Sequence, residues 1–393
     1  MLTSLAYILL LGLLLGSLAR RLHLPPLVGM IAAGILLGPA CLNLLSPSLL
    51  SISADLRQLA LIIILTRAGL SLDLAALKRV GRPAILMCFV PACFEMAGMV
   101  LLAPPLLGVS LLDAAIMGAV VGAVSPAVIV PRMLKITEEG YGTAKGLPQL
   151  VLAGASVDDV FVIVMFTLFT GLASGEAVSP LSLAGVPVSI LLGAAVGLGL
   201  GVALAAFFKA FHMRDSVKVV ILLSLAFLLV AAQDALEGLI PFSGLLAVMG
   251  MGLGLQRRRG EVALRLSSKF SKLWVAAEVA LFVLVGAAVD LKYAAAAGVG
   301  AVLAVLGALC FRSLGVAVCV AGSGFSGKEK LFCILSYLPK ATVQAAIGGV
   351  PLAMGLACGQ VVLTVAVIAI LVTAPLGAAA IDLSYRRLLS KDS

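Results

Sequence analysis

The amino-acid sequence predicts an all-α polytopic membrane protein with about thirteen transmembrane helices, and three observations support this fold class. The first is composition: 62% of the 393 residues are hydrophobic and only 11% are charged, whereas about a quarter of the residues in a soluble domain are charged. The mean hydropathy is +1.23, and no soluble fold has an interior large enough for so many apolar side chains. The seven cysteines include no CxxC pair, which argues against a disulfide-built secreted scaffold.

The second observation is a series of apolar segments near the ~20 residues that a spanning helix needs. The thirteen segments lie near residues 3–19, 25–40, 57–72, 83–104, 110–131, 147–172, 181–208, 218–233, 241–256, 273–290, 295–321, 331–354 and 359–380. The second and the ninth are short for a full span.

The third observation is the distribution of Lys and Arg. Alternate connectors, together with the C-terminus, contain 22 of the 27 basic residues; the opposite set contains two, and three lie inside spans. Cytoplasmic loops carry the excess of basic residues, so we place the N-terminus outside and the C-terminus in the cytoplasm. The net charge of +9 is thereby explained by topology, and no nucleic acid is expected as a partner. The compact chain favours a bacterial inner membrane.

Three short matches predict an internal repeat. PLVGMIAAG at 26–34 resembles PFSGLLAVM at 241–249, GLSLDL at 69–74 resembles GAAVDL at 286–291, and prolines interrupt helices at Pro126 and Pro339. The offsets are nearly constant, and a shift of seven spans inverts the second copy. We therefore expect a first repeat at 1–180, a linking helix at 181–211 and an inverted repeat at 212–393. Inverted repeats with broken helices are typical of secondary transporters that bind their substrate near the bilayer midplane.

The two proline-containing segments predict broken, crossing helices. Pro126 cannot bond the carbonyl of Gly122, Pro131 is expected to end the regular pattern, and Pro339 frees a carbonyl in the second segment. Such groups are tolerated at membrane depth only inside protein or beside a water-filled cavity. Ser125 and Thr342 stand at the breaks, where they can cap a helix or bind an ion. Ordinary proline kinks are the alternative interpretation.

The ionisable residues inside the spans are candidates for function, because each costs about 3 kcal/mol at the bilayer centre. Asp158 and Asp159 are adjacent in LAGASVDDVFVIVMF, and successive helical residues point about 100° apart. One carboxylate can therefore face a cationic partner while the other faces an aqueous cavity. A carboxylate removed from water can hold either a proton or a hard cation such as Na⁺. The alternative is a pair of acids that only lock helices together.

Two of these motifs carry a resemblance to a known family. ASVDDVFVI and LPKATVQAAIG resemble the NHA branch of the monovalent cation/proton antiporter superfamily, which has the sodium/hydrogen exchanger fold. The resemblance extends over essentially the whole transmembrane region. It implies a homodimer of thirteen-helix chains that needs no cofactor, in which a core bundle and a dimerisation bundle are interleaved in sequence and the core moves like an elevator.

The resemblance also assigns roles to residues. It implies that Asp159 alternately binds Na⁺ or Li⁺ and a proton, and that Asp158 pairs with Arg312. Glu95 and Lys340 would form a second buried pair. Ser125, Ser156 and Thr342 complete the expected ion-binding set. Many members of the superfamily have Lys where this chain has Arg312, and because Arg does not release its proton we expect electroneutral exchange.

Two other functions share part of this pattern. A Na⁺-coupled symporter of an organic anion could share the inverted-repeat plan, but it would not require adjacent aspartates. An intramembrane aspartyl protease would need two carboxyls facing one water, whereas Asp158 and Asp159 diverge along one helix. We therefore expect a transporter and no enzyme. The run Arg257, Arg258 and Arg259 is expected to contact anionic lipids, and Arg67 is expected to pair with Glu278.

Overall fold

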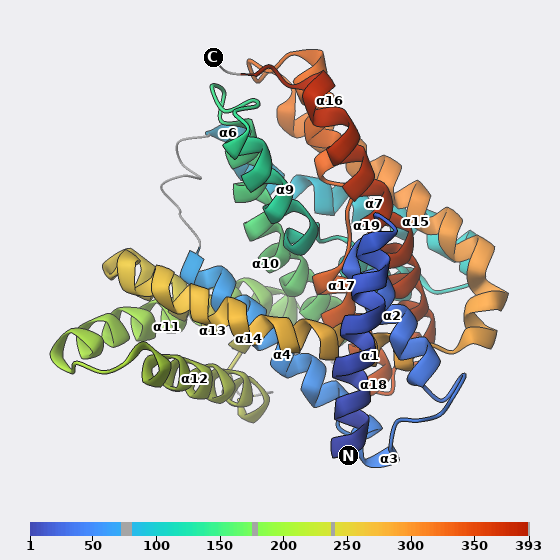
Figure 1. Ribbon diagram of the computed structural model, residues 1–393, viewed down its shortest axis with the longest axis horizontal. Helices are drawn as coiled ribbons and strands as arrows, with labels where there is room; N and C mark the ends of the chain where they lie inside the picture. Colours follow the sequence, from blue (N-terminus) through green and yellow to red (C-terminus); the bar gives the residue numbers. More distant parts are fainter. Residues whose placement is uncertain (72–80, 175–179, 237–239, 392–393) are drawn as a thin grey trace. The chain divides into compact units, whose positions relative to one another are not determined.

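The computed structural model describes residues 1–71, 81–174, 180–236 and 240–391 (Figure 1). Throughout these ranges the named elements are helices, and the pairing of extended backbone is limited to an isolated bridge between Tyr141 and Lys391. Within the same ranges, nine helices are long and apolar enough to cross a membrane. The chain is therefore an all-helical membrane protein, and the count of thirteen spans stays a prediction.

The helices, in chain order, are α1 (Leu2–Arg21), α2 (Pro26–Leu37), α3 (Pro47–Leu50), α4 (Ser53–Ser71), α6 (Arg82–Met87), α7 (Val90–Leu107), α8 (Leu111–Val121), α9 (Pro126–Glu138), α10 (Leu147–Ala173), α11 (Pro180–Ala210), α12 (Asp215–Ala235), α13 (Gly244–Arg258), α14 (Gly260–Ala287), α15 (Leu291–Val320), α16 (Gly327–Ser336), α17 (Thr342–Ile347), α18 (Val350–Ala353) and α19 (Gly359–Leu388).

The helices group into two compact units, each assembled from segments that are far apart in sequence. Unit 1 consists of Met1–Ala54, Asp73–Ser174 and Leu281–Ser393, and unit 2 of Asp55–Leu72 and Gly175–Ala280. Unit 1 therefore contains α6 to α10 and α15 to α19, which include both segments with predicted breaks. The repeat boundaries at residues 180 and 212 stay a prediction.

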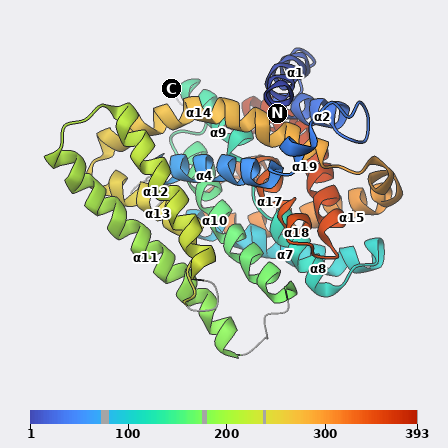
Figure 2. The same ribbon diagram turned by 90° about the horizontal axis from the view of Figure 1, so that it is seen from below.

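Unit 2 contains a close pair of long helices, α11 and α13, which lie near α12 (Figure 2). A Cβ added to Gly197 would lie 2.2 Å from the carbonyl oxygen of Ala247, and one added to Gly201 would lie 2.1 Å from that of Met251. Because backbone faces backbone at both points, no side chain fits there, and an alanine would push the helices apart. The two glycines therefore fix the spacing of this pair.

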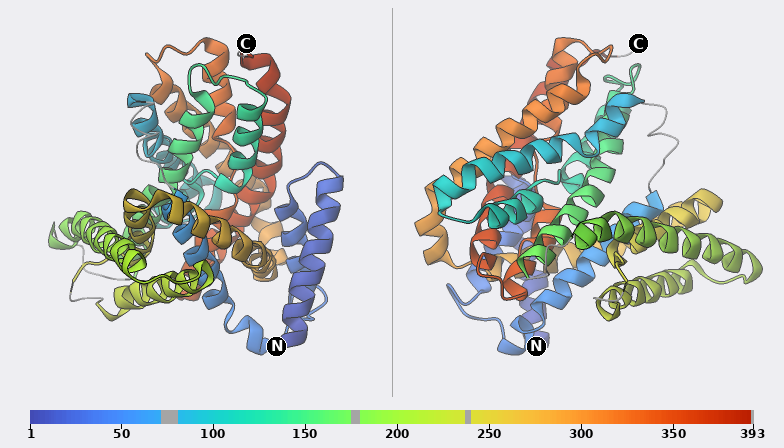
Figure 3. Two further views of the ribbon diagram at one scale, coloured as in Figure 1. Left: turned by 60° about the vertical axis from the view of Figure 1, so that its left-hand side comes forward. Right: turned by 180° about the vertical axis from the view of Figure 1, so that it is seen from behind.

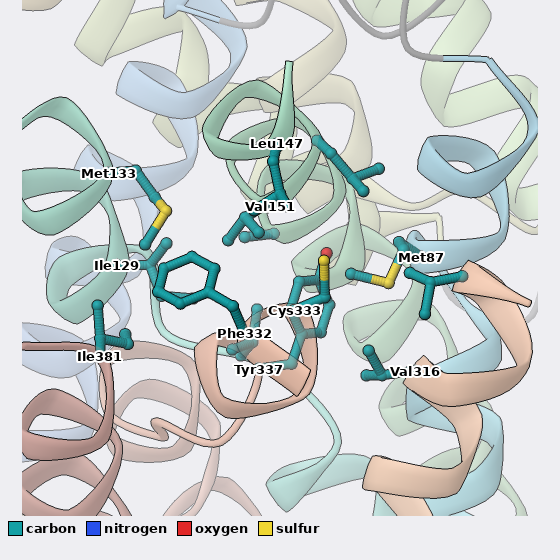
Figure 4. Close-up of a cluster of buried hydrophobic side chains, with 14 of the residues drawn as sticks. Met87, Ile129, Met133, Leu147, Val151, Val316, Phe332, Cys333, Tyr337 and Ile381 are labelled. Atoms are coloured by element: carbon teal, nitrogen blue, oxygen red, sulfur yellow. The ribbon is translucent and has the colours of Figure 1, made fainter. Parts of the chain in front are cut away.

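In unit 1, α1 packs along α2 (Figure 3) and α7 packs along α15. A separate group of buried side chains joins α9, α10, α16 and α19 around the Tyr337 ring, and α15 contributes Val316 (Figure 4). Phe332, Met133 and Tyr337 are completely shielded from solvent. Close packing of this kind holds α9, which follows the first predicted break, against α16, which precedes the second.

Two local expectations from the sequence were wrong. The basic stretch after residue 256 was expected to be a connector, yet α13 extends to Arg258 and α14 begins at Gly260. Residues 261–285 contain no glycine or proline, so nothing interrupts the helix there.

Pro131 was expected to end its helix, but α9 continues through it to Glu138. It lies close to the start of α9, so the carbonyl that it leaves unbonded belongs to the first turn, at Ala127. The side chain of Arg132 also donates a hydrogen bond to the carbonyl of Val128 (2.9 Å).

Candidate ion-binding site

Two interrupted helices meet inside unit 1. The first stops at Val121 and resumes at Pro126, and the second stops at Ser336 and resumes at Thr342. Pro126 occupies the first turn of α9, a position that needs no backbone donor. The backbone N–H of Ser125 donates to the carbonyl of Pro339 at 2.8 Å. The two non-helical stretches therefore contact each other directly, and each supplies polar groups that its own helix does not use.

Arg312, on α15, connects both breaks through one guanidinium group. Its Nε donates to the carbonyl of Tyr337 (2.8 Å), and one terminal nitrogen donates to the carbonyl of Gly122. The Gly122 carbonyl is the acceptor that Pro126 was expected to leave unbonded. Arg312 is completely buried, so these contacts are made in a low-dielectric interior, where hydrogen bonds to a charged group are strong.

The same guanidinium neutralises two carboxylates. Its two terminal nitrogens lie 2.7 Å from Glu95 Oε2 and 2.7 Å from Asp158 Oδ2. Lys340 Nζ lies 2.5 Å from the same Glu95 oxygen. The expectation of two separate pairs was therefore incomplete. The residues Asp158, Arg312, Glu95 and Lys340 form one chain of alternating charges, hereafter the charge cluster, whose formal charges cancel.

Asp159 differs from its neighbour because it takes no part in a salt bridge within the described residues. Its side chain is buried, and its Oδ1 has no hydrogen-bond partner in that part of the chain. Three other buried side-chain oxygens near the first break lack a partner there, namely Ser125 Oγ, Asp158 Oδ1 and Gln344 Oε1. Buried polar atoms in native proteins are almost always paired. Acceptor oxygens of this kind are the ligands that a hard monovalent cation requires, and no cofactor is needed to explain them.

Gln344, in the short helix α17, is a site residue that the sequence reasoning missed. It is fully buried, and its amide nitrogen donates to the carbonyl of Ala123 at 2.8 Å and more weakly to that of Val121 at 3.4 Å. The available signal was a polar residue in the apolar segment LPKATVQAAIG. Thr373 was missed as well; its hydroxyl accepts from the backbone N–H of Lys340 at 2.9 Å and so satisfies the second break.

The remaining predicted residues are placed as follows. Thr342 is buried and begins α17 directly after the second break. Ser156 lies in α10, and its side chain falls outside the described residues. In unit 2, Glu278 lies close enough to Arg67 to act on its charge, and the expected ion pair between them stays a prediction.

Ion pairs outside the spans connect the ends of the same helices. Burial opposes ionisation of Glu329, yet hydrogen bonds from Lys145 (2.9 Å) and from the N–H of Ser326 keep the pKa of Glu329 below its ordinary value. Hydrogen bonds from the Tyr385 hydroxyl (2.8 Å) and from Arg386 lower the pKa of Glu139. These carboxylates therefore stay ionised at neutral pH and tie α9 to α19, and the connector before α10 to α16.

Comparisons with known proteins bear on the family and the fold of the chain. The family model described as sodium/hydrogen exchanger, transmembrane, matches residues 6–381. The chain is 35% identical to sodium/hydrogen exchanger 9B2 of Mus musculus, with 94% of this chain and 69% of that relative covered, and 36% identical to the Homo sapiens protein of that name, with 94% and 70% covered. A structure of the sodium proton antiporter MjNhaP1 from Methanocaldococcus jannaschii superposes with a TM-score of 0.87 at 22% identity and covers 98% of both chains.

Proposed function

Because the chain belongs to the sodium/hydrogen exchanger family, we propose that it exchanges Na⁺ or Li⁺ for H⁺ across a membrane, with Asp159 as the residue that binds both. One observation carries this proposal: Asp159 is a buried carboxyl without a cationic partner in the described residues, and it adjoins a charge cluster that is already neutral. A secondary antiporter of this kind needs no cofactor, because the ions are its cargo.

The chemistry follows from the cost of a buried charge. An unpaired carboxylate in a low-dielectric interior is strongly disfavoured, so it acquires a counter-ion or a proton. A proton and a cation such as Na⁺ or Li⁺ compete for this one carboxyl. That competition couples their movements. We propose Ser125, Thr342 and Asp158 Oδ1, which has no hydrogen-bond partner among the described residues, as further ligands for Na⁺ or Li⁺. The sequence adds Ser156 to this set.

We propose electroneutral exchange of one cation for one proton. Arg312 keeps its charge at any working pH, and it is committed to four acceptors. It therefore has no proton to release when a cation binds at Asp159. In this scheme Lys340 stays paired with Glu95, and Asp159 is the group whose proton is exchanged.

The remaining proposals concern movement, assembly and membrane. Both interrupted helices, α10 and α15 belong to one compact unit, which supports an elevator motion in which the ion-binding bundle moves as one body. We extend the proposal to a homodimer with the N-terminus outside and the C-terminus in the cytoplasm. A bacterial inner membrane, and contact of Arg257 to Arg259 with anionic lipids, stay predictions.

The test is transport by purified protein in liposomes with a pH dye in the lumen. A proton gradient is imposed, and Na⁺, Li⁺ or K⁺ is then added outside. We expect Na⁺- or Li⁺-dependent proton movement that Asp159→Asn abolishes, because an amide can exchange neither ion. The matched control is Asp382→Asn, which removes an exposed carboxylate paired with Arg132. Clamping the voltage with valinomycin and K⁺ should leave the rate unchanged if exchange is electroneutral.

Two results would contradict the proposal. Full transport by Asp159→Asn would exclude this residue as the exchange site. Absence of proton movement with every cation, from protein with a cooperative unfolding transition, would favour Na⁺-coupled symport of an organic anion.

A further inference from the structure

Unit 2 contains a cavity lined mainly by cationic side chains. Its volume is about 680 Å³, which is within the range of small-molecule sites. It lies where the end of α11 and the starts of α12 and α14 converge. The lining residues are Phe208, Lys209, His212, Met213, Arg214, Lys218, Arg259, Val262 and Arg265. Five of the nine are Lys or Arg, and none is an acid.

Little of this positive charge is neutralised locally. Asp215 pairs through one oxygen with Lys218 (3.1 Å) and through the other with Arg265 (3.0 Å). Within the described residues, Lys209, Arg214 and Arg259 form no salt bridge. One carboxylate therefore serves five cations, and the cavity keeps an excess of about four positive charges.

Part of the lining is held rigidly. The side chain of Lys218 is only 9% exposed and lies 5.7 Å from the centre of the Phe208 ring. Arg259 is the single residue between α13 and α14, and it donates to the carbonyl of Phe208 at 3.1 Å. Burial of Lys218 and the hydrogen bond of Arg259 cost free energy in the protein without a ligand. Because both side chains are already held in place, an anion that enters the cavity meets donors that need little rearrangement.

Membrane topology alone does not account for this convergence. The excess of basic residues on cytoplasmic connectors requires charge near the membrane surface, with no need for the charges to surround one hollow. Arg257, Arg258, Lys269 and Lys272 serve topology equally well, and none of them lines the cavity. Both connectors that form the cavity belong to the side that the basic residues predict to be cytoplasmic.

We propose that this cavity binds a phosphorylated organic anion, through its phosphate groups. Lys and Arg are the usual phosphate ligands, and Arg can donate to two phosphate oxygens at once. The volume exceeds that of one phosphate, which favours a ligand with several phosphates or a phosphate joined to a polar headgroup. The source is a soluble polyphosphate compound or the headgroup of an anionic lipid. This site is independent of the transport proposal, since none of its residues lies in an interrupted helix.

The experiment measures binding by the purified full-length chain at constant ionic strength. Inorganic tripolyphosphate is titrated by calorimetry in one arm, with sodium sulfate as the reference anion. In the second arm, native mass spectrometry measures retention of phosphatidylglycerol against phosphatidylcholine. Tripolyphosphate binding alone assigns a soluble ligand, lipid retention alone assigns a headgroup, and both together indicate a shared phosphate site.

The decisive variant combines Lys209→Gln with Arg214→Gln, which removes two cations of the cavity that form no salt bridge in the described part of the chain. Its matched control is Lys269→Gln with Lys272→Gln, which removes the same charge from exposed positions outside the cavity. We expect at least about a tenfold loss of affinity in the first and less than about twofold in the second, because only the first variant removes charged donors that face the cavity. The charge-retaining double variant Lys209→Arg with Arg214→Lys should still bind the probes.

Equal losses in both double variants would overturn the proposal, since they would indicate unspecific attraction to net charge. Saturable binding of neither probe by the parent protein would overturn it as well. Thermal unfolding without ligand identifies a variant that fails to fold. If the Gln double variant fails to fold, the charge-retaining variant Lys209→Arg with Arg214→Lys is used instead, and loss of binding in this folded variant would overturn the proposal.

Discussion

Gln344 and Asp158 hold opposite ends of the same peptide group. The amide of Gln344 donates to the carbonyl oxygen of Ala123 at 2.8 Å, and Oδ2 of Asp158 accepts from the N–H of Val124 at 2.9 Å. These two atoms belong to one planar unit, whose oxygen and hydrogen point in opposite directions. The second interrupted helix thereby determines how the first presents its backbone to the aspartate pair.

Gln344→Leu should weaken cation binding more than it slows turnover. Without the amide, the carbonyls of Val121 and Ala123 lose a buried donor, at a cost of about 1–3 kcal/mol. The peptide group at Asp158 is then free to reorient. We expect the Na⁺ concentration for half-maximal transport to rise about tenfold, measured with the liposome assay at several Na⁺ concentrations.

The control for this prediction is Gln360→Leu, because the side-chain nitrogen of Gln360 is buried without a partner in the described residues and its loss breaks no donated bond. An unchanged Na⁺ dependence in Gln344→Leu would show that the peptide group needs no support from the second helix.

Arg312→Met should destabilise the protein by about 3–5 kcal/mol, because it leaves two buried carboxylates without their shared cation. Arg312→Lys should also destabilise it, though less, since one ammonium cannot reach Tyr337, Gly122, Glu95 and Asp158 together. Thermal unfolding of the purified variants measures both effects. Equal stability of parent and Lys variant would mean that charge alone matters at this position.

Glu95 and Lys340 should be energetically coupled. Glu95→Gln leaves Lys340 buried without its carboxylate, whereas Glu95→Gln combined with Lys340→Met removes both charges. The double variant should therefore lose less stability than the sum of the two single variants, by about 1–3 kcal/mol. A complete double-mutant cycle of unfolding free energies tests this. Additive losses would show that the 2.5 Å contact contributes nothing net.

The Lys145–Glu329 pair predicts a specific pH dependence. The pKa of Glu329 lies below its ordinary value of 4.5, so the ionised carboxylate stabilises the folded state above that value. This contribution disappears as the pH falls through the lowered pKa. Lys145→Met should therefore melt at a lower temperature than the parent at about pH 7. The difference between the two melting temperatures should shrink as the pH falls toward about 3.

Lys135→Met is the control for the pH experiment, because its pair with Glu139 is exposed and 3.9 Å long, and such pairs contribute little. A temperature difference for Lys145→Met that does not change with pH would rule out the ion pair as its cause.

The sequence was informative where a residue conflicts with its surroundings. Asp158, Asp159, Arg312 and Lys340 could be predicted because a charge in an apolar span is conspicuous, and Pro126 because proline lacks a backbone donor. Gln344 was missed because an uncharged amide in a short helix costs little by itself. Its role depends on the carbonyl of Ala123, which is 221 positions away, and no local pattern specifies that contact.

The sequence by itself determined the membrane class, the positions of the helix breaks and the identity of the buried charges, because all three depend on hydropathy and backbone chemistry within a few residues. Only the tertiary structure decided which charges meet. Glu95 is separated from Arg312 by 217 positions and from Lys340 by 245, yet one of its oxygens accepts from both. Hydrogen bonds and ion pairs act over about 3 Å, so partners are chosen by helix packing. That packing leaves Asp159 outside the neutral charge cluster.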